Sequence, residues 1–291
     1  MVNKAYKNII YEKKPPIAYV TLNRPEKVNA LSIDLQKEVK DALEDAGWKD
    51  GEIRVIVIKG AGRGFSAGFD MSGEGGAANA VQICDQLLLH HEGFNATSFW
   101  DVFWGNKKPI IAQVHGFCLA GGCATACFCD LCICSEDALF GAPEIRFGGP
   151  YMPAIWPWIL GPRKTRELLY TGNLIDAQEA WRLGLVNKVV PKDKLDEEVN
   201  KLAQTISKVP AVCVEYSKKL VNMAYELMNI RLVMERSSEL EAMAMASPES
   251  SPEIAEYQRI EQEQGLKAAL VWNSDRFAEE DAWFKEPRRK G

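Results

Sequence analysis

The residues best suited to chemistry lie in one stretch, 108–151, where a glycine-rich turn precedes a single acidic side chain, Glu144. The turn contains Gly121 and Gly122 and runs into small residues that are typical of a tightly packed helix. A turn of this kind exposes backbone N–H groups at a helix N-terminus, and those donors can hold a developing negative charge. A carboxylate beside them can move a proton, so the stretch carries the two parts that an enolate needs.

Strands and helices with clear patterns surround this stretch. Ser32 is expected to cap a helix with apolar residues at 35, 39 and 43, and Asp176 is expected to cap another. A further helix is expected at 163–170 and a nearly continuous helical region at 193–246, broken only near Pro210. The last helix is expected to end near Asn273. Four apolar runs predict buried strands: Ile17–Leu22, Val55–Ile58, Ile110–Val114 and Leu131–Cys134.

The loop after the second strand, residues 59–70, contains four glycines. Glycine permits backbone conformations and close approaches that other residues resist, so this density favours a loop whose backbone contacts a ligand. A mobile surface turn is the alternative.

Composition limits the classes of protein to consider. A chain of 291 residues fits one large domain with a helical appendage. The net charge is −5, so no overall field attracts nucleic acid or an anionic membrane, and any phosphate site must be local. The charged N-terminus and the lack of a long apolar run favour a cytoplasmic protein without a signal peptide.

Cysteine use is uneven, because five of the eight cysteines lie between 123 and 134. Metal binding is one interpretation. No histidine is interleaved, however, and the run is otherwise apolar, so small buried hydrophobic residues and no metal site are expected.

Aromatic residues gather between Phe94 and Trp104, where they indicate either an amphipathic packing helix or the wall of an apolar pocket. The three histidines are weak candidates for acid–base work: His90 and His91 precede the aromatic run, and His115 precedes the glycine turn.

Several ordered blocks along nearly the whole chain match one known family. The blocks are LNRPEKVNAL at 22–31, FSAGFD at 65–70, KPIIA at 108–112, Gly116 with AGGC at 120–123, Cys129-Asp130, Pro143-Glu144, and YTG at 170–172 with AQEA at 177–180 and GLV at 184–186. In these residues and their spacing the chain resembles the enoyl-CoA hydratase/isomerase (crotonase) superfamily.

The resemblance implies an α/β fold, a spiral of repeated ββα units followed by a C-terminal helical trimerisation region. On this basis we expect a core with the acyl-CoA site at residues 1–195 and an oligomerisation region at 196–291. It further implies a homotrimer or a dimer of trimers.

The resemblance also implies a site. The substrate would be an acyl-CoA, with coenzyme A as part of the thioester and no separate cofactor. The thioester oxygen would lie between the backbone N–H groups of Phe69 and Gly121, with Glu144 as the acid–base residue. Lys27 would be the first candidate for the CoA phosphates, with Arg24 and Arg63 as weaker ones, and Phe277 would match an aromatic that covers a neighbour's CoA. The other expected CoA contacts are Val28, Ala30, Ala67, Gly68 and Asp70.

The chain departs from the hydratase pattern at one position. Hydratases of the superfamily carry a second glutamate where this chain has Ala124, and hydration divides its proton transfers between two carboxylates. One carboxylate suffices to move a proton along an acyl chain, so the chain resembles the Δ3,Δ2-enoyl-CoA isomerases. Met152 replaces the aspartate of the dehalogenase and dienoyl-isomerase branches. The nearby Tyr151, Trp156 and Trp158 are expected either to narrow the acyl pocket or to belong to the core.

Three functions remain open on the sequence. The first is an enzyme that moves, or with one acid hydrates, the double bond of an enoyl-CoA. The second is another enolate reaction, such as thioester hydrolysis or C–C cleavage of a cyclic acyl-CoA. The third is a non-catalytic binding protein such as the RNA-binding members of the superfamily, which the scattered charges disfavour.

Overall fold

The computed structural model describes residues 5–70, 96–147, 155–245, 252–279 and 281. The expectations for His90, His91, Tyr151 and Met152 concern residues outside the described ones. Among the described residues, no helix has the length and apolar character needed to cross a membrane.

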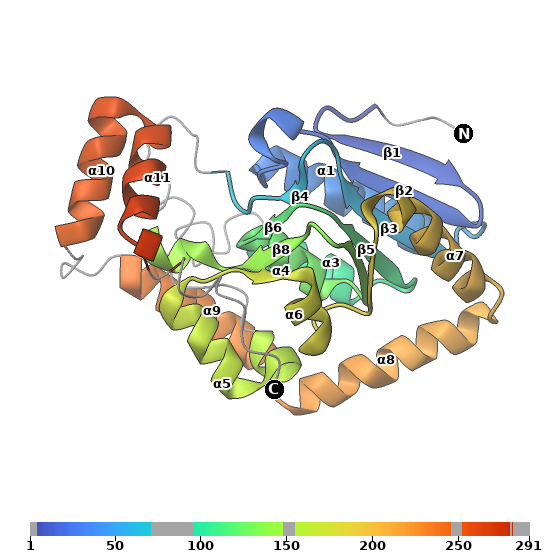
Figure 1. Cartoon of the computed structure of the whole chain (residues 1–291). Helices are drawn as coiled ribbons and strands as arrows, with labels where there is room; N and C mark the ends of the chain where they lie inside the picture. Colours follow the sequence, from blue (N-terminus) through green and yellow to red (C-terminus); the bar gives the residue numbers. More distant parts are fainter. Residues whose placement is uncertain (1–4, 71–95, 148–154, 246–251, 280, 282–291) are drawn as a thin grey trace.

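Two sheets form the centre of the molecule (Figure 1). The larger one is parallel except for its first strand, which pairs antiparallel with the second. Its order is β1 (Ile9–Lys14), β2 (Ile17–Leu22), β3 (Val55–Gly60), β5 (Ile110–Val114), β7 (Leu131–Ser135) and β10 (Lys188–Val190). The four predicted strands are therefore confirmed, with β3 and β7 slightly longer than expected.

The smaller sheet is made of short strands, of which the first three each follow a strand of the larger sheet and the last follows a helix. Its order is β4 (Gly64–Ser66), β6 (Phe117–Leu119), β8 (Leu139–Gly141) and β9 (Ile175–Asp176). The chain thus passes repeatedly from a long strand to a short one and then toward a helix, with β5, β6 and α4 (Gly121–Phe128) as the clearest example. The spiral of ββα units that the sequence implied is present.

The alternation of side chains in β3 explains how both faces of the larger sheet are covered. Ile56 and Ile58 point into the main core, whereas Val55 and Val57 point to the other face, where they pack with Val199 of α7 (Leu195–Ser207). A strand that is buried on both faces needs apolar residues at every position. The run Val-Ile-Val-Ile meets that need.

The main core lies between the sheets and the helices that pack on them, among them α1 (Ile33–Glu44) and α3 (Ala96–Trp104). Helix α1 starts at its Ser32 cap, whose hydroxyl accepts a hydrogen bond from Leu35 N. The aromatic run forms α3, in which Phe99, Trp100 and Phe103 are buried. Their interpretation as packing residues of an amphipathic helix is confirmed.

The remaining helices follow the spiral. Asp176 caps α6 (Ala177–Arg182) as predicted, by accepting a hydrogen bond from Glu179 N. The helix expected at 163–170 is α5 (Trp156–Thr171), which starts earlier and is kinked at Gly161. Its first residue, Trp156, belongs to the core.

The C-terminal third is helical, with one more break than the sequence predicted. Helices α8 (Ala211–Leu227) and α9 (Ile230–Met245) are separated at Asn229, which has a left-handed backbone with φ of 62°. A residue with a left-handed backbone cannot continue a right-handed α-helix, so the helical region is interrupted here. Asparagine tolerates this conformation better than most residues. After residue 251, α10 (Pro252–Gln264) and α11 (Leu266–Asp275) form a hairpin that turns at Gly265 (Figure 1).

Candidate active site

The site is built where the carboxyl ends of β3 and β5 lead into two loops. One loop, residues 61–70, follows β3, and the other leads from β5 through β6 to Ala120 and the first turn of α4. Open ends of parallel strands are the usual place for ligands in α/β proteins, because loops there converge without disturbing the sheet. The two glycine-rich segments that the sequence singled out are thus neighbours.

The backbones of these loops touch at Gly68 and Gly121. A Cβ atom added to Gly68 would lie 2.6 Å from Ala120 Cβ and 3.3 Å from Gly121 N, and Gly68 has φ of 103°. The Phe69 ring lies against Gly121, because a Cβ there would come within 3.0 Å of Phe69 Cε2. Only glycine permits this approach at both positions.

The amide of Gly121 is the first of helix α4, so it has no partner within its own helix. Ala120, which precedes it, holds a left-handed φ of 50° while its own N–H donates to Gly141 O at 2.8 Å. A non-glycine residue in this conformation is strained, and such strain persists where the surrounding structure imposes it. The turn is therefore held in a fixed shape by β8.

The side chain of Asn29 holds the loop 61–70 in place through hydrogen bonds to its backbone. This side chain is fully buried, and its amide Nδ2 donates to the carbonyl oxygens of Ala61, Gly64 and Phe65 at 2.8, 2.9 and 3.2 Å. Its Oδ1 accepts from Arg24 N at 2.9 Å. The two amide protons of one side chain, shared among three carbonyl oxygens, thus join the segment 24–31 to the loop after β3. Sequence reasoning assigned Asn29 no role.

Ser66 continues this support toward the site. Its buried hydroxyl donates to Asn29 O at 2.9 Å and accepts from Gly68 N at 3.2 Å. The backbone adds Leu31 N to Gly68 O at 2.7 Å and Ala67 N to Val28 O at 2.9 Å. The predicted CoA contacts Val28, Ala67 and Gly68 therefore belong to one hydrogen-bonded pair of segments.

Two cations of the first segment are paired with the acid at the end of the loop. Arg24 makes a 2.7 Å ion pair with Asp70 and also donates to Ala30 O at 2.7 Å. Lys27 lies 3.7 Å from the same carboxylate, and its side chain is 41% exposed compared with 14% for Arg24. Lys27 is thus the more accessible cation, in keeping with its rank as the first phosphate candidate. Arg63 is exposed and lies over the Phe117 ring.

Glu144 lies in the short turn η4 (Pro143–Phe147), which follows β8. Its Oε2 atom is shielded from solvent. Its charge also reaches α4: a hydrogen bond with Cys118, burial, and the nearby Glu144 carboxylate raise the pKa of the Cys123 thiol well above its usual value. Cys123 is the third residue of α4, so the carboxylate is near enough to act on a thiol in the first turn of this helix.

Ala124 follows Cys123 and is fully buried in the first turn of the same helix. Its side chain offers neither a donor nor an acceptor for protons. Asp70 is the acidic residue next to Phe69 in the chain, and it is engaged by Arg24. Neither position therefore supplies a second acid like Glu144.

The remaining candidates lie elsewhere or serve packing. His115 Nε2 lies 2.9 Å from Gly62 O, and the imidazole lowers the pKa of Asp196 on α7, although less than the hydrogen bond from Gln113 does. The cysteines of α4 and β7 are mostly buried as free thiols. In the described part of the chain, no group of three His, Cys, Asp or Glu side chains is arranged to hold a metal ion.

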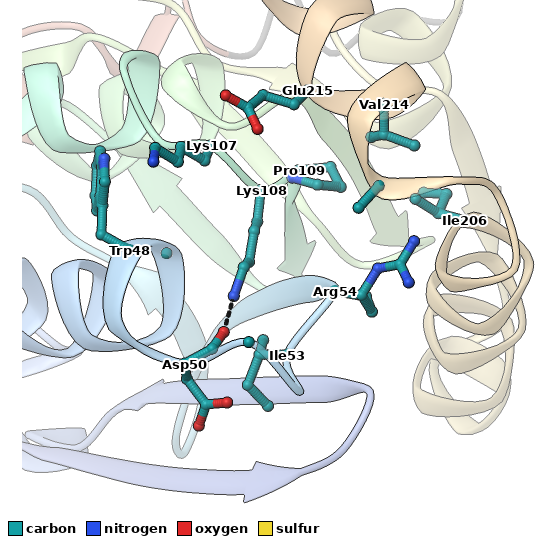
Figure 2. Close-up of a pocket in the computed structure, with 13 residues that line it drawn as sticks. Trp48, Asp50, Ile53, Arg54, Lys107, Lys108, Pro109, Ile206, Val214 and Glu215 are labelled. Atoms are coloured by element: carbon teal, nitrogen blue, oxygen red, sulfur yellow. Dashed lines mark hydrogen bonds between the residues drawn. The ribbon is translucent and has the colours of Figure 1, made fainter.

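A cavity of about 220 Å³ lies at the opposite, amino ends of β3 and β5, beside the π-helical turn η2 (Asp45–Lys49) (Figure 2). Trp48, Arg54 and Lys107 line it. The ammonium of Lys108 enters it, but this group donates to the carbonyl oxygens of Ala46 and Asp50. This ammonium is thus committed to the backbone, and Arg54 donates to Val209 O, which makes this cavity a poorer candidate than the site at Gly121.

The family model for enoyl-CoA hydratase/isomerase matches residues 12–260. The chain belongs to this family and is an enzyme of the enoyl-CoA hydratase/isomerase type. The curated relatives include the crotonyl-CoA hydratase of Syntrophomonas wolfei, 36% identical over 225 residues that cover 75% of this chain and 82% of the relative. A probable mitochondrial enoyl-CoA hydratase of Dictyostelium discoideum is 37% identical over 74% of this chain and 76% of its own length.

Solved structures of the family share the fold. An enoyl-CoA hydratase/isomerase from Xanthobacter autotrophicus Py2 superposes with a TM-score of 0.82 at 32% identity, covering 94% of this chain and 99% of that one. A monofunctional enoyl-CoA isomerase from Mycobacterium smegmatis superposes with a TM-score of 0.61 at 26% identity, covering 75% and 94%. The predicted fold class is thereby confirmed.

Proposed function

We propose that this enzyme is a one-base enoyl-CoA isomerase that converts a 3-enoyl-CoA into the conjugated 2-enoyl-CoA. The observation that carries the proposal is Ala124. It occupies the first turn of α4, where the hydratases of the family carry a second glutamate, and it is fully buried. With Asp70 paired to Arg24, Glu144 is the base that the site offers.

In the proposed reaction, the Glu144 carboxylate takes a proton from C2 of the β,γ-unsaturated thioester. The electron pair left behind spreads over C2, C4 and the thioester oxygen, which gives a dienolate. Glu144 then returns the same proton to C4, and the double bond moves from C3–C4 to C2–C3. No water or other reactant is consumed, so one carboxylate is enough.

The backbone N–H groups of Phe69 and Gly121 are the proposed donors to the thioester oxygen. Their loops are in contact, and the positive end of the α4 dipole lies at Gly121. A fixed donor of this kind lowers the barrier to acyl chemistry by roughly 3–4 kcal/mol, since it stabilises charge that develops only during the reaction. Enclosure of the carboxylate would favour its neutral form and suit it to carrying a proton.

We further propose that the CoA moiety lies along the segment 27–30 and the loop 67–70, with Lys27 toward the phosphates. In the family-based scheme the spiral, residues 1–195, holds this site, and the helices from residue 196 onward assemble trimers. Supporting this division, α8 exposes apolar side chains such as Leu220 and Leu227, although α7 also packs on the larger sheet.

A one-acid enoyl-CoA hydratase is the second candidate, because hydratase names predominate among the relatives. The two reactions are separated by giving the enzyme trans-3-enoyl-CoA and trans-2-enoyl-CoA of matched length. Conversion of the first without hydration of the second is the expected result.

Glu144→Gln removes the proposed base and keeps its shape. We expect it to lower the isomerisation kcat by roughly 10²–10⁴-fold, the usual contribution of a positioned acid–base group. Glu136→Gln, an exposed residue after β7, is the matched control and should retain full activity. Glu144-dependent hydration of the 2-enoyl substrate would replace the isomerase proposal with the hydratase one.

A further inference from the structure

The guanidinium of Arg146 joins the turn that holds Glu144 to two distant parts of the chain. Its Nε donates to Thr171 O at 2.7 Å, and Nη2 donates to Asn173 Oδ1 at 2.6 Å, both at the end of α5. Nη1 and Nη2 donate to the two oxygens of Asp281 at 3.1 and 2.8 Å. This two-point pairing fixes direction as well as distance.

The Arg146 side chain is enclosed rather than extended into solvent. It is 11% exposed, and Cζ lies 4.2 Å from the centre of the Phe277 ring, which therefore covers one guanidinium face. Arginine is favoured in such a place because its planar group can stack and donate several hydrogen bonds together, whereas lysine cannot reproduce this geometry.

The end of α5 is shaped to receive this side chain. Gly172 has φ of 64°, and a Cβ there would lie 2.8 Å from Arg146 Cγ and 2.9 Å from Ile145 Cγ2. The absence of a side chain at Gly172 thus allows η4 to lie directly against the helix end. The end of α5 therefore packs directly on the turn that carries Glu144.

The other partner belongs to the C-terminal segment. The hairpin of α10 and α11 has its own small cluster around Tyr257, Ile260 and Ala269, separate from the main core. Its continuation carries Phe277 and Asp281, which reach back to Arg146. The hairpin therefore contacts the spiral next to the proposed base.

We propose that Arg146 is a positioning residue that couples docking of the C-terminal segment to the placement of the Glu144 carboxylate. This inference rests on the proposed function, in which Glu144 moves the proton. Glu144 and Arg146 share one turn of five residues, and a 3₁₀ turn has weaker internal hydrogen bonds than an α-helix. An external clamp at Arg146 supplies the rigidity that the turn lacks.

The proposal predicts losses in kcat with little change in KM, because a displaced base still permits the thioester to bind. A shift of about 1 Å in a catalytic group can lower the rate roughly 100-fold. We expect a kcat loss of that order for Arg146→Ala, a smaller one for Arg146→Lys, and a loss of about 3–10-fold for Asp281→Asn. The Asp281→Asn change should add nothing when Arg146 is already alanine, since both remove the same contact.

Arg259→Ala and Glu263→Gln are the matched controls. They break an exposed ion pair within α10 and should leave both kcat and KM unchanged. Circular dichroism and the thermal unfolding midpoint establish that each variant is folded. Losses that appear only in KM, an unchanged kcat for Arg146→Ala, or additive losses in the double variant would each overturn the coupling.

Hydrogen exchange separates this inference from the proposed function. In Asp281→Asn we expect faster exchange in the peptide 139–147 as well as in the C-terminal hairpin. In Glu263→Gln, exchange in the peptide 139–147 should be unchanged. If the wild type converts neither enoyl-CoA, the proposed function fails and exchange alone decides the coupling. Unchanged exchange at 139–147 would then refute it.

Discussion

Helices α4 and α8 belong to the same chain but depend on opposite kinds of contact. Every residue of α4 except Cys127 is buried, although the helix has only eight residues. Helix α8 has 17 residues and buries none of them. Apart from Val221, its large exposed apolar side chains follow a helical period: Val212, Tyr216, Leu220, Met223 and Leu227.

The difference separates a helix whose apolar residues are buried within its own chain from a helix whose apolar residues remain exposed. Small residues let α4 fit between the sheets, so intramolecular packing sets the position of Gly121. An exposed apolar stripe of the α8 kind is typical of a surface that another chain covers. The proposed trimer would provide that cover. We therefore expect packing within the spiral to set the shape of the site, and assembly of the chains to cover the apolar stripe of α8.

The largest effect is expected from Asn29→Ala compared with Asn222→Ala. Loss of Asn29 leaves three carbonyl oxygens of the site loop without their shared donor, and alanine tolerates the left-handed φ of 53° poorly. We expect the free energy of unfolding to fall by roughly 3–5 kcal/mol. Urea unfolding followed by circular dichroism measures this.

Asn222, on α8, makes one hydrogen bond, to Trp104 O at 2.7 Å. Its replacement by alanine should lower the free energy of unfolding by only about 1 kcal/mol. Equal losses for the two asparagines would contradict the view that the spiral loops carry more of the stability than α8 does.

The second effect concerns the apolar stripe of α8. The double change Leu220→Gln and Leu227→Gln should weaken association of the chains by about 1.5–3 kcal/mol per leucine that becomes buried, without unfolding the spiral. Analytical ultracentrifugation across a concentration series measures the assembly. Tyr170→Gln on α5, at a side chain that is 77% exposed, is the control. An unchanged assembly in the double variant would exclude the stripe as an interface.

The smallest effect on stability is expected at Cys213 of α8. This thiol is exposed, so Cys213→Ser should change the free energy of unfolding by less than about 0.5 kcal/mol. Burial raises the pKa of the Cys118 thiol to about 11 and that of the Cys134 thiol to about 12. Both remain protonated and unreactive at pH 8, because the thiolate is the nucleophile.

Labelling with a thiol reagent, followed by peptide mapping, measures how fast each of these three cysteines reacts. Cys213 should be labelled within the first minutes, and Cys118 and Cys134 only after denaturant is added. Raising the pH from 7 to 9 should leave Cys118 and Cys134 protected in the folded protein, because burial holds the pKa of each thiol above this range. Rapid labelling of Cys118 in the folded protein would show that the core around α4 opens readily.

Features that rest on local chemistry were predicted well. Ser32 and Asp176 are helix caps because an oxygen close in sequence reaches the free amides of the first turn. The strands follow from apolar runs, and the glycine turn from its spacing. The break at Asn229 was missed, because asparagine is only weakly typical of a helix end.

Contacts between distant segments escaped prediction. Arg24 resembles a phosphate ligand in sequence, but the fold gives it Asp70. Asn29 and Arg146 carry no signal of their own, since the carbonyls that Asn29 Nδ2 reaches lie 32 to 36 residues away and the hydrogen-bond partners of Arg146 lie 25 to 135 residues away.

The sequence by itself determined the family, four buried strands of the larger sheet, two helix caps, the glycine turn and the exchange of a glutamate for Ala124. These follow from residue type and spacing. Only the tertiary structure decided which side chains meet: that Asn29 closes the site loop and that Arg146 ties η4 to the C-terminal segment. The reason is physical, since hydrogen-bonding groups bond to whatever the folded backbone brings within about 3 Å. Sequence distance does not set that approach.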